Sequence, residues 1–267
     1  MLNKIRNRVK VESPLVHAIT NPISINQCAN TILAVGARPI MAEHPGEVEE
    51  ITSTTKALML NIGNITDVRM ESIPIALECA IAHGIPVVLD VVGVACSSMR
   101  KEFVANLLKI ATPTVIKGNY SEIKALYDMK YTSEGVDADS DISITDMTEI
   151  CSLLSRRLST IILASGKTDI ITDGKRLIQI SNGSEQLSKV TGTGCMLGAL
   201  CAAYMAVEQS VDAVITACVM LGVCGQISET EKGNGSFMVN LLDSLSTLPD
   251  EYINRLARTE EKSLEEI

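Results

Sequence analysis

The stretch PVVLDVV, residues 86–92, decides the fold class of this 267-residue chain. It is an apolar run with a single carboxylate, whereas a strand with one solvent-exposed face alternates apolar and polar residues. An unbroken apolar strand is typical of a parallel sheet covered by helices on both faces. Asp90 then lies near the carboxyl end of the strand, where open α/β sheets bind ligands. The alternative interpretation is that Asp90 caps the following turn.

The same alternation of short apolar runs and longer helical patterns extends along the chain. Further strands are predicted at Leu15–Ile19, Ala57–Ile62, Thr114–Lys117 and Thr160–Ala164. Helices are predicted at Pro22–Val35, Glu47–Thr55, Ser72–His83, Met99–Ile110, Ser121–Met129, Thr145–Leu158, Gly194–Glu208, Val211–Glu229 and Ser236–Leu248. Asn21 is the expected N-cap of the first of these helices, with proline at its first position.

The later part of the chain departs from this alternation. Asp169 to Ser181 carries an Asp-Gly pair between two β-rich runs, which predicts a hairpin. Thr132–Ser143 is rich in Ser and Asp and is expected to be a loop within the domain. The sequence therefore predicts one α/β domain over residues 1–267, with three layers and a mostly parallel central sheet that ends in an antiparallel hairpin.

Composition excludes several classes of protein. The net charge of −9 argues against nucleic acid as a partner, because phosphate binding requires a basic surface. The long uncharged runs, Val190–Val207 and Ala213–Ser228, fall short of the roughly 20 apolar residues that a bilayer requires. The basic stretch MLNKIRNRVK, residues 1–10, lacks the apolar region of a signal peptide, so none is expected. None of the eight cysteines has CxxC spacing, which favours reduced thiols over zinc or disulfides. We therefore expect a cytoplasmic protein that binds neither nucleic acid nor membrane.

The run VTGTGC, residues 190–195, precedes an apolar helix and has the composition of an anion site. Glycines before a helix let its unpaired N–H groups approach an anion, which the helix dipole also favours. The alternative is a loop with a threonine cap. The run is not a P-loop, because no Gly-Lys-Ser/Thr follows, and its GxGxxxG spacing only approaches the dinucleotide-binding motif.

Cys195 lies at the first turn of that helix. A thiol there has a stabilised anion, with pKa values of roughly 3.5 to 7.5 in favourable cases, so it can serve as base or nucleophile. The alternative is a small buried apolar residue, which is the interpretation given to Cys201, Cys218 and Cys224.

A second polar group is predicted where the segment VIKGNYSEIKAL, residues 115–126, leaves a strand and enters a helix. Lys117 is expected at the same edge of the sheet as Asp90. Asn119 and Glu122 have the spacing of a capping box, which by itself explains Glu122. Two carboxylates at adjacent strand ends can also hold Mg²⁺ through waters. Ser165 ends a third strand at this edge.

Six segments resemble the hydroxyethylthiazole kinase family, in order and over most of the chain: HAITN (17–21), GARPIMA (36–42), NIGN (61–64), LDVVG (89–93), KGNYSEI (117–123) and VTGTGCM (190–196). The resemblance implies a ribokinase-like fold and a kinase that uses ATP and Mg²⁺ to phosphorylate 4-methyl-5-(2-hydroxyethyl)thiazole. Other members of that superfamily usually end the glycine run in Asp, and the thiazole kinases end it in Cys. The resemblance also implies that the protein is a homotrimer.

The resemblance further implies a role for each matching residue. Cys195 takes the proton of the substrate alcohol. The nucleotide and its transferring phosphate are held by Lys117, Ser165, Thr191, Gly192, Thr193 and Gly194. The thiazole is contacted by Met41, Asn21 and Gly192, and Mg²⁺ is organised by Asp90 and Glu122.

The chain departs from the family pattern at several of these positions. Val91 replaces a proline, which is expected to loosen the turn that aims Asp90. Lys117 and Ser165 stand where Arg and Thr are usual, and Asn64 replaces a common Thr. A lysine offers a point charge in place of a bidentate fork, which predicts weaker nucleotide binding. The competing functions are another small-alcohol kinase of the superfamily, a non-catalytic nucleotide sensor on the same fold, and a dinucleotide oxidoreductase.

Overall fold

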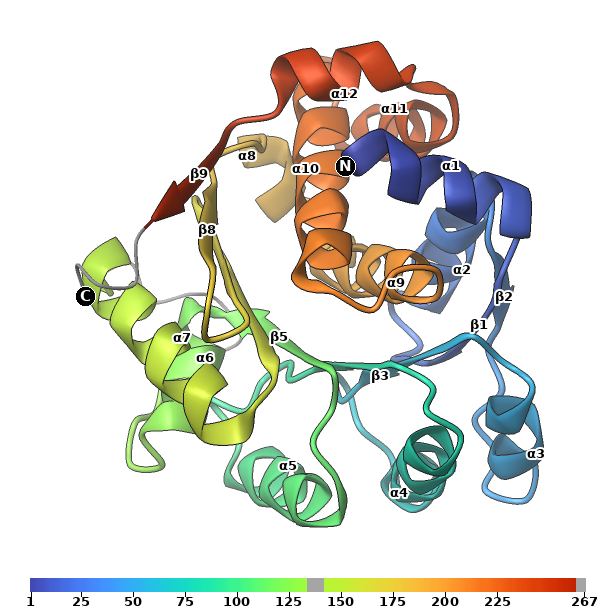
Figure 1. The fold of residues 1–267 in the computed structure, drawn as a ribbon, viewed down its shortest axis with the longest axis vertical. Coiled ribbons are helices and arrows are strands. Elements are labelled where there is room, and N and C mark those ends of the chain that lie inside the picture. The colour runs from blue at the N-terminus through green and yellow to red at the C-terminus, as the bar shows by residue number, and fades with distance from the viewer. Residues whose placement is uncertain (134–141, 263–267) are drawn as a thin grey trace.

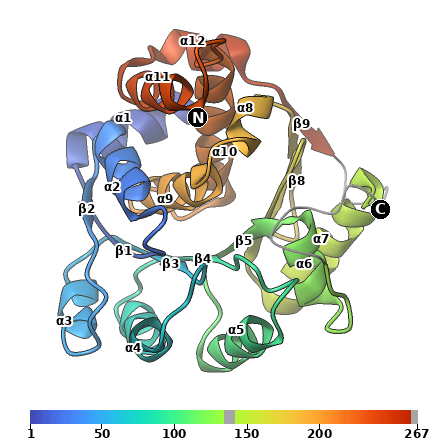
Figure 2. The ribbon, with the colours of Figure 1, turned by 180° about the vertical axis from the view of Figure 1, so that it is seen from behind.

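The structure, a computed structural model, describes residues 1–133 and 142–262 (Figure 1). Most of the loop expected at Thr132–Ser143 lies outside the described residues. One sheet runs through the middle of the molecule, and helices cover both of its faces (Figures 1 and 2). The predicted α/β class with three layers is confirmed. The assignment of residues 1–267 to one domain stays a prediction.

The sheet has nine strands among the described residues, in the order β2-β1-β3-β4-β5-β6-β7-β8-β9. The pairs from β2 to β6 are parallel, and those from β6 to β9 are antiparallel. The strands are β1 (Leu15–Ile19), β2 (Arg38–Ile40), β3 (Ala57–Asn61), β4 (Val87–Asp90), β5 (Val115–Asn119), β6 (Ile161–Ser165), β7 (Asp169–Thr172), β8 (Leu177–Ile180) and β9 (Thr259–Lys262). The predicted hairpin is β7–β8.

The helices divide between the two faces of the sheet (Figure 2). One face is covered by α1 (Leu2–Glu12), α2 (Ile25–Ala34), α8 (Glu185–Ser188), α9 (Thr193–Met205), α10 (Val211–Ile227), α11 (Asn234–Thr247) and α12 (Asp250–Leu256). The other is covered by α3 (Val48–Ser53), α4 (Asp67–Ala82), α5 (Ser98–Ile110), α6 (Tyr120–Tyr127) and α7 (Ile144–Leu158).

The apolar strands are unbroken because both faces of the sheet are buried. Successive side chains of a strand point to opposite faces. In β3, Ala57 and Met59 therefore belong to the core beneath α9, whereas Leu58 and Leu60 belong to the core beneath α4. Each strand residue thus meets a hydrophobic layer, which explains the pattern that predicted the parallel sheet.

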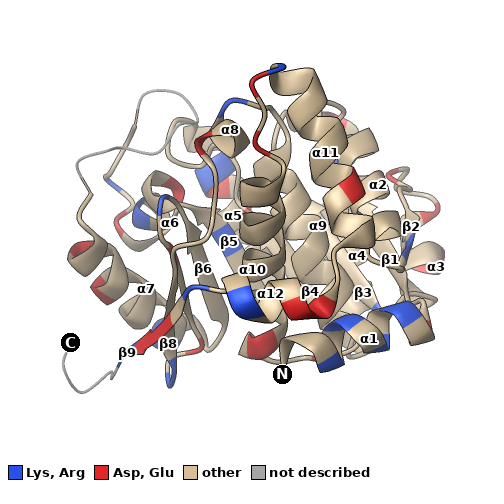
Figure 3. Cartoon of the chain, turned by 90° about the horizontal axis from the view of Figure 1, so that it is seen from above, with Lys and Arg blue, Asp and Glu red and all other residues tan. Residues whose placement is uncertain are grey.

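Helix α9 is apolar around its whole circumference and carries no charged residue, as Figure 3 shows. A helix of this kind must be covered on all sides, and α9 packs against β3 and β4 on one side and against α2 and α10 on the others. None of the described helices is long and apolar enough to cross a membrane. The burial of α9 fixes its N-terminus at one edge of the sheet.

Several predicted boundaries were wrong. Helix α2 begins at Ile25 with Ser24 as its N-cap, and not at Pro22. The Asn21 carboxamide oxygen instead accepts from the amides of Ile23 and Ser24 (both 3.1 Å), so it closes a turn before the helix. Helix α4 begins five residues earlier than predicted, at Asp67, and contains Pro74.

Candidate active site

The carboxyl ends of the parallel strands bring three polar side chains side by side. Asn61 ends β3, Asp90 ends β4, and the strand register pairs Asn61 with Asp90 and Asp90 with Lys117 on β5. All three are buried, with 0%, 0% and 3% of their surfaces exposed. Each strand is apolar until it reaches this edge, so the sequence concentrates its polar groups where the sheet ends.

Asp90 and Lys117 form a buried ion pair. The Lys117 ammonium donates to both carboxylate oxygens of Asp90 at 3.1 Å. Burial alone would lower the pKa of Lys117, but the carboxylate of Asp90 raises it well above its usual value, so the ammonium stays charged. A methyl group added at Gly194 would lie 3.6 Å from this ammonium, so Lys117 reaches the N-terminus of α9.

Glu122 has the capping role that its spacing predicted. One carboxylate oxygen accepts from the Asn119 amide, and the other accepts from the Gly93 amide, both at 2.7 Å. Asn119 in turn accepts from the Glu122 amide, which completes the capping box. Burial, with the nearby charge of Asp90, raises the pKa of Glu122 to about 7. Glu122 thus ties the start of α6 to the turn after β4.

The turn after β4 is also held by Val91. Its amide donates to the carbonyl of Lys117 at 2.9 Å, and the side chain is fully buried. A proline at this position would have no N–H to donate. Valine in place of proline therefore adds a backbone hydrogen bond between the turn after β4 and strand β5, where the sequence led us to expect a looser turn.

The donor set at this edge fits a magnesium ion held through its waters. Asp90 and Glu122 are both buried, and the one buried ammonium beside them, Lys117, is paired with Asp90, so the Glu122 charge is uncompensated when both carboxylates are ionised. Each carboxylate oxygen already accepts a hydrogen bond, and two carboxylates alone cannot complete the octahedral shell of Mg²⁺. Among the described residues no group of three or more His, Cys, Asp or Glu is arranged to hold a metal. Mg²⁺ usually keeps several waters, which matches such a site.

The glycine run, residues 190–195, forms the N-terminus of α9. Gly192 is the N-cap and has a φ of +93°, a left-handed conformation that favours glycine. A Cβ there would lie 3.3 Å from Cβ of Ser24, so the run also packs closely on the start of α2. The Thr193 hydroxyl bonds to the carbonyl of Leu187 (2.7 Å). The helix N-terminus presents unpaired amides and a positive dipole end, as an anion site requires.

Cys195 lies in the first turn of this helix, beside the buried polar residues. Its sulfur is 3.3 Å from the amide nitrogen of Asn61 and 3.4 Å from that of Asn21. Burial and the charge of Asp90 raise the pKa of the thiol, although Lys117 and Asn21 oppose the shift. The expectation of a lowered pKa was therefore wrong, because desolvation outweighs the helix dipole here.

A cavity of about 670 Å³ opens at the other side of the α9 N-terminus. Its wall includes Ser165, Thr193 and Gly194, three of the residues predicted to hold the nucleotide. Asp169 and Asn182 also line it, and the sequence had not singled them out. The cavity lies between the end of β6, the segment after β8, and helices α9 and α10, so it is built from elements far apart in the sequence.

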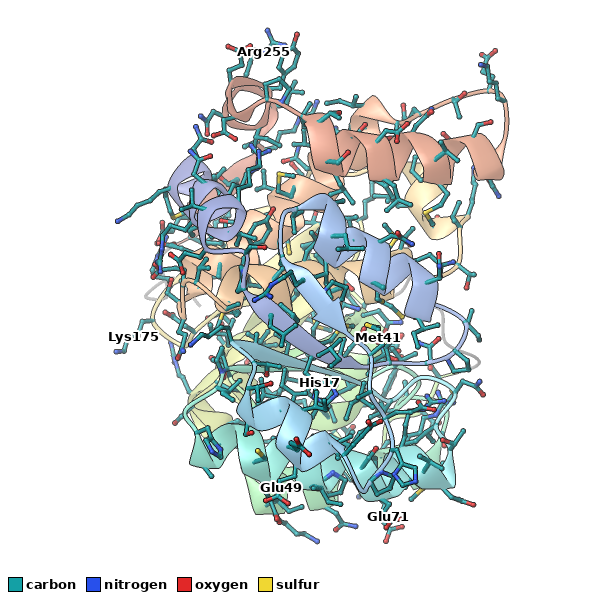
Figure 4. All side chains as sticks on the ribbon, turned by 90° about the vertical axis from the view of Figure 1, so that its right-hand side faces the viewer. His17, Met41, Glu49, Glu71, Lys175 and Arg255 are labelled. Atoms are coloured by element: carbon teal, nitrogen blue, oxygen red, sulfur yellow. The ribbon has the colours of Figure 1, made fainter. Side chains whose placement is uncertain are left out.

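Two predicted residues lie outside this arrangement. Thr191 is exposed and is not part of the cavity wall. Met41 follows β2 and is half-buried against the core beneath α9. The carbonyl of the next residue, Ala42, is 2.9 Å from Nε2 of His17, and Figure 4 labels both His17 and Met41. β2 is two strands away from β3, so Met41 lies at the same edge of the sheet but beyond Asn21.

Known proteins resemble this chain in sequence and in fold. The model of the hydroxyethylthiazole kinase family matches residues 6–251. The chain belongs to the hydroxyethylthiazole kinase family. It is 45% identical over 260 residues to hydroxyethylthiazole kinase 2 of Clostridium botulinum, a match that covers 96% of this chain and 98% of that protein.

Solved structures give the same family and fold. The structure of a hydroxyethylthiazole kinase protein from Pyrococcus horikoshii has a TM-score of 0.90 at 33% identity, and the match covers 98% of this chain and 99% of the other. A ribokinase-like superfamily protein from Enterococcus faecalis has a TM-score of 0.65 at 9% identity, with 96% and 94% covered, which shows the fold alone. The predicted ribokinase-like fold is confirmed, and membership of a kinase family implies ATP as the phosphoryl donor.

For this member of the hydroxyethylthiazole kinase family, Asn61 is a further site residue that sequence reasoning missed. It contacts Asp90, Asn21 and Cys195, yet it had been treated only as part of the predicted strand Ala57–Ile62 and of a family segment. The available signal was its position: like Asp90, it is the first polar residue after an apolar strand. An asparagine there has an ordinary alternative role in a turn, so the sequence alone did not distinguish it.

Proposed function

We propose that this protein transfers the γ-phosphoryl group of ATP to the primary alcohol of 4-methyl-5-(2-hydroxyethyl)thiazole. The observation that carries the proposal is the position of Cys195, between the cavity at the N-terminus of α9 and the buried polar edge of the sheet. The nucleotide occupies the cavity, with its terminal phosphate at the first amides of α9. Ser165 and Thr193 line its path, and Lys117 lies next to Gly194.

The reaction joins the alcohol oxygen to the γ-phosphorus as the bond to ADP breaks, and the hydroxyl proton passes to the sulfur of Cys195. Phosphoryl transfer has a loose transition state, so positioning and charge stabilisation dominate. The raised pKa of Cys195 makes its anion a stronger base, although less of it is present at neutral pH. We assign it a rate contribution of about 10²–10⁴-fold.

The same proposal includes the remaining ligands and the assembly. Asp90 and Glu122 would hold Mg²⁺, which would supply positive charge against the phosphates. Asn21, Met41 and Gly192 lie around the thiazole. We also propose that the protein is a cytoplasmic homotrimer. Light scattering coupled to size-exclusion chromatography tests the trimeric state.

The test is a panel of small alcohols incubated with ATP and Mg²⁺ and scored by phosphorylated product. We expect the thiazole alcohol to give the highest kcat/KM. A different preferred alcohol would assign another small-alcohol kinase, and ATP binding with no transfer to any alcohol would favour a nucleotide sensor.

Two variants test the role of Cys195. Cys195→Ala is expected to lower kcat by about 10²–10⁴-fold while ATP binding persists, because only the base is lost. Cys195→Asp restores a carboxylate base and is expected to remain active. Equal and complete inactivity of both variants would show that the thiol is structural.

A further inference from the structure

Two buried carboxamides meet at the Cys195 sulfur. The side-chain nitrogens of Asn21 and Asn61 lie 3.4 Å and 3.3 Å from it. Asn21 follows β1 and Asn61 ends β3, so two neighbouring strands place them together. Only 5% of Asn21 and none of Asn61 is exposed. Buried amides of this kind are ordered by the bonds they make.

The bonds of Asn61 fix the orientation of its amide. Its oxygen accepts from the backbone amide of Gly63 at 2.9 Å, and its nitrogen donates to a carboxylate oxygen of Asp90 at 2.8 Å. A backbone N–H can only donate and an ionised carboxylate can only accept. Exchanging oxygen and nitrogen would break both bonds, so the nitrogen must face the sulfur of Cys195.

Asn21 is fixed in the same way. Its oxygen accepts from the backbone amides of Ile23 and Ser24, both at 3.1 Å. Its nitrogen therefore points the other way, where it donates to the oxygen of Asn61 (3.0 Å) and to the sulfur. The turn that displaces the start of α2 is thus what aims this amide at Cys195.

The two amides make the sulfur an acceptor on two sides. Each amide donates one N–H to the Cys195 sulfur. The other N–H of Asn21 donates to Asn61, and the other N–H of Asn61 donates to Asp90. We propose that Asn21 and Asn61 are positioning residues that, together with the Ser24 hydroxyl, hold the Cys195 sulfur in place to face the substrate alcohol. This inference rests on the proposed function, and it gives Asn21 a role through the sulfur in addition to its place beside the thiazole.

A double-mutant cycle with Cys195→Ala tests the proposal. Displacing a reacting atom by about 1 Å can cost about 10²-fold in rate, so Asn61→Ala is expected to lower kcat by about that factor. In the Cys195→Ala background the same change is expected to lower kcat by less than about threefold, because no sulfur remains to be positioned. An equal loss in both backgrounds would overturn the proposal, since the effect would then pass through Asp90 or the fold.

Asn61→Asp removes the donor at nearly constant size, and it also places a second carboxyl group beside Asp90. It keeps the size of the side chain and one acceptor oxygen but removes the N–H groups, so we expect at least the loss of Asn61→Ala. Wild-type kcat in Asn61→Asp would overturn the proposal. Asn106→Ala, at an exposed site on α5, is the matched control and is expected to leave kcat unchanged. Thermal unfolding and the dissociation constant of ATP, measured for every variant, exclude loss of the fold.

A measurement without turnover keeps this inference separate from the proposed function. In ¹⁵N-labelled protein, the side-chain amide resonances of Asn21 and Asn61 are expected to move when Cys195 is replaced by Ala. If the wild type phosphorylates no alcohol, the proposed function fails and these resonances alone decide whether the amides hold the sulfur. Unchanged resonances would overturn the proposal even if the thiazole is phosphorylated.

Discussion

A single added methyl group at Gly222 tests the contact that closes the cavity. Gly222 lies in the middle of α10, and a Cβ there would be 2.6 Å from Cβ of Asn182 and 2.7 Å from its carbonyl oxygen. Carbon atoms pack best at 3.5–4.0 Å, so Gly222→Ala requires a shift of about 1 Å. The neighbour cannot rotate away, because backbone atoms of Asn182 are among the contacts.

Asn182 is also held from the other side. Its amide nitrogen donates to Gln226 and to the carbonyl of Leu256, both at 2.8 Å, and its oxygen accepts from the amide of Arg258 at 2.6 Å. A shift of Asn182 therefore strains the connection between α12 and β9 as well as the cavity wall.

The expected change in stability is the difference of two effects. Overpacking costs about 1–3 kcal/mol, and replacing a helix-interior glycine by alanine returns about 0.5–1 kcal/mol. We expect Gly222→Ala to lower the free energy of unfolding by up to about 2.5 kcal/mol, or Tm by up to roughly 10 °C for a chain of this size. Because Asn182 and Gly222 both line the cavity, the dissociation constant of ATP is expected to rise.

Thermal unfolding followed by circular dichroism measures the change, with titration calorimetry for ATP. Gly235→Ala is the matched control, since a Cβ there meets nothing within 4 Å and the residue is in α11. It is expected to leave Tm unchanged or slightly higher. A Tm for Gly222→Ala equal to or above that of Gly235→Ala would refute the close approach of α10 and Asn182.

Three further predictions concern charge and space at the site. Lys117→Met leaves Asp90 buried without its partner and is expected to lower the free energy of unfolding, measured in urea, by about 3–5 kcal/mol. Adding Asp90→Asn to the same chain is expected to recover much of this loss, and no recovery would contradict the ion pair. Burial raises the pKa of Asp169 to about 7, so the protonated carboxyl stabilises the fold at low pH and this contribution is lost as pH rises from about 4 through 7. Asp169 is half-buried, which limits the effect, so Asp169→Asn is expected to stabilise the protein by about 2 kcal/mol at pH 8 and by much less at pH 4. Equal pH dependence of unfolding in the wild type and in Asp169→Asn would contradict this prediction. Gly194→Val places a side chain beside the Lys117 ammonium and is expected to weaken ATP binding more than Cys195→Ala, as calorimetry would show.

The sequence predicted the fold class because burial on both faces of a sheet leaves a local mark. Five strands follow from unbroken apolar runs, and the late hairpin follows from an Asp-Gly turn. It missed α1, α8, α12, β2 and β9, whose patterns are weaker: α8 has four residues, β2 has three, and β9 is the exposed sequence TEEK at the edge of the sheet. Such strands form because a neighbouring strand offers hydrogen bonds, which no local pattern records.

For the candidate site, the sequence alone determined which chemical groups stand at the strand ends and at the mouth of α9, including Asp90, Lys117 and Cys195. Tertiary structure decided what these groups do to one another. Burial raises the pKa of Cys195 where its place on the helix predicted a lower one, and Asn61 becomes part of the site because β3 lies between β1 and β4. The physical reason is that desolvation and hydrogen bonding depend on neighbours in space, whereas capping and strand patterns depend on neighbours in sequence.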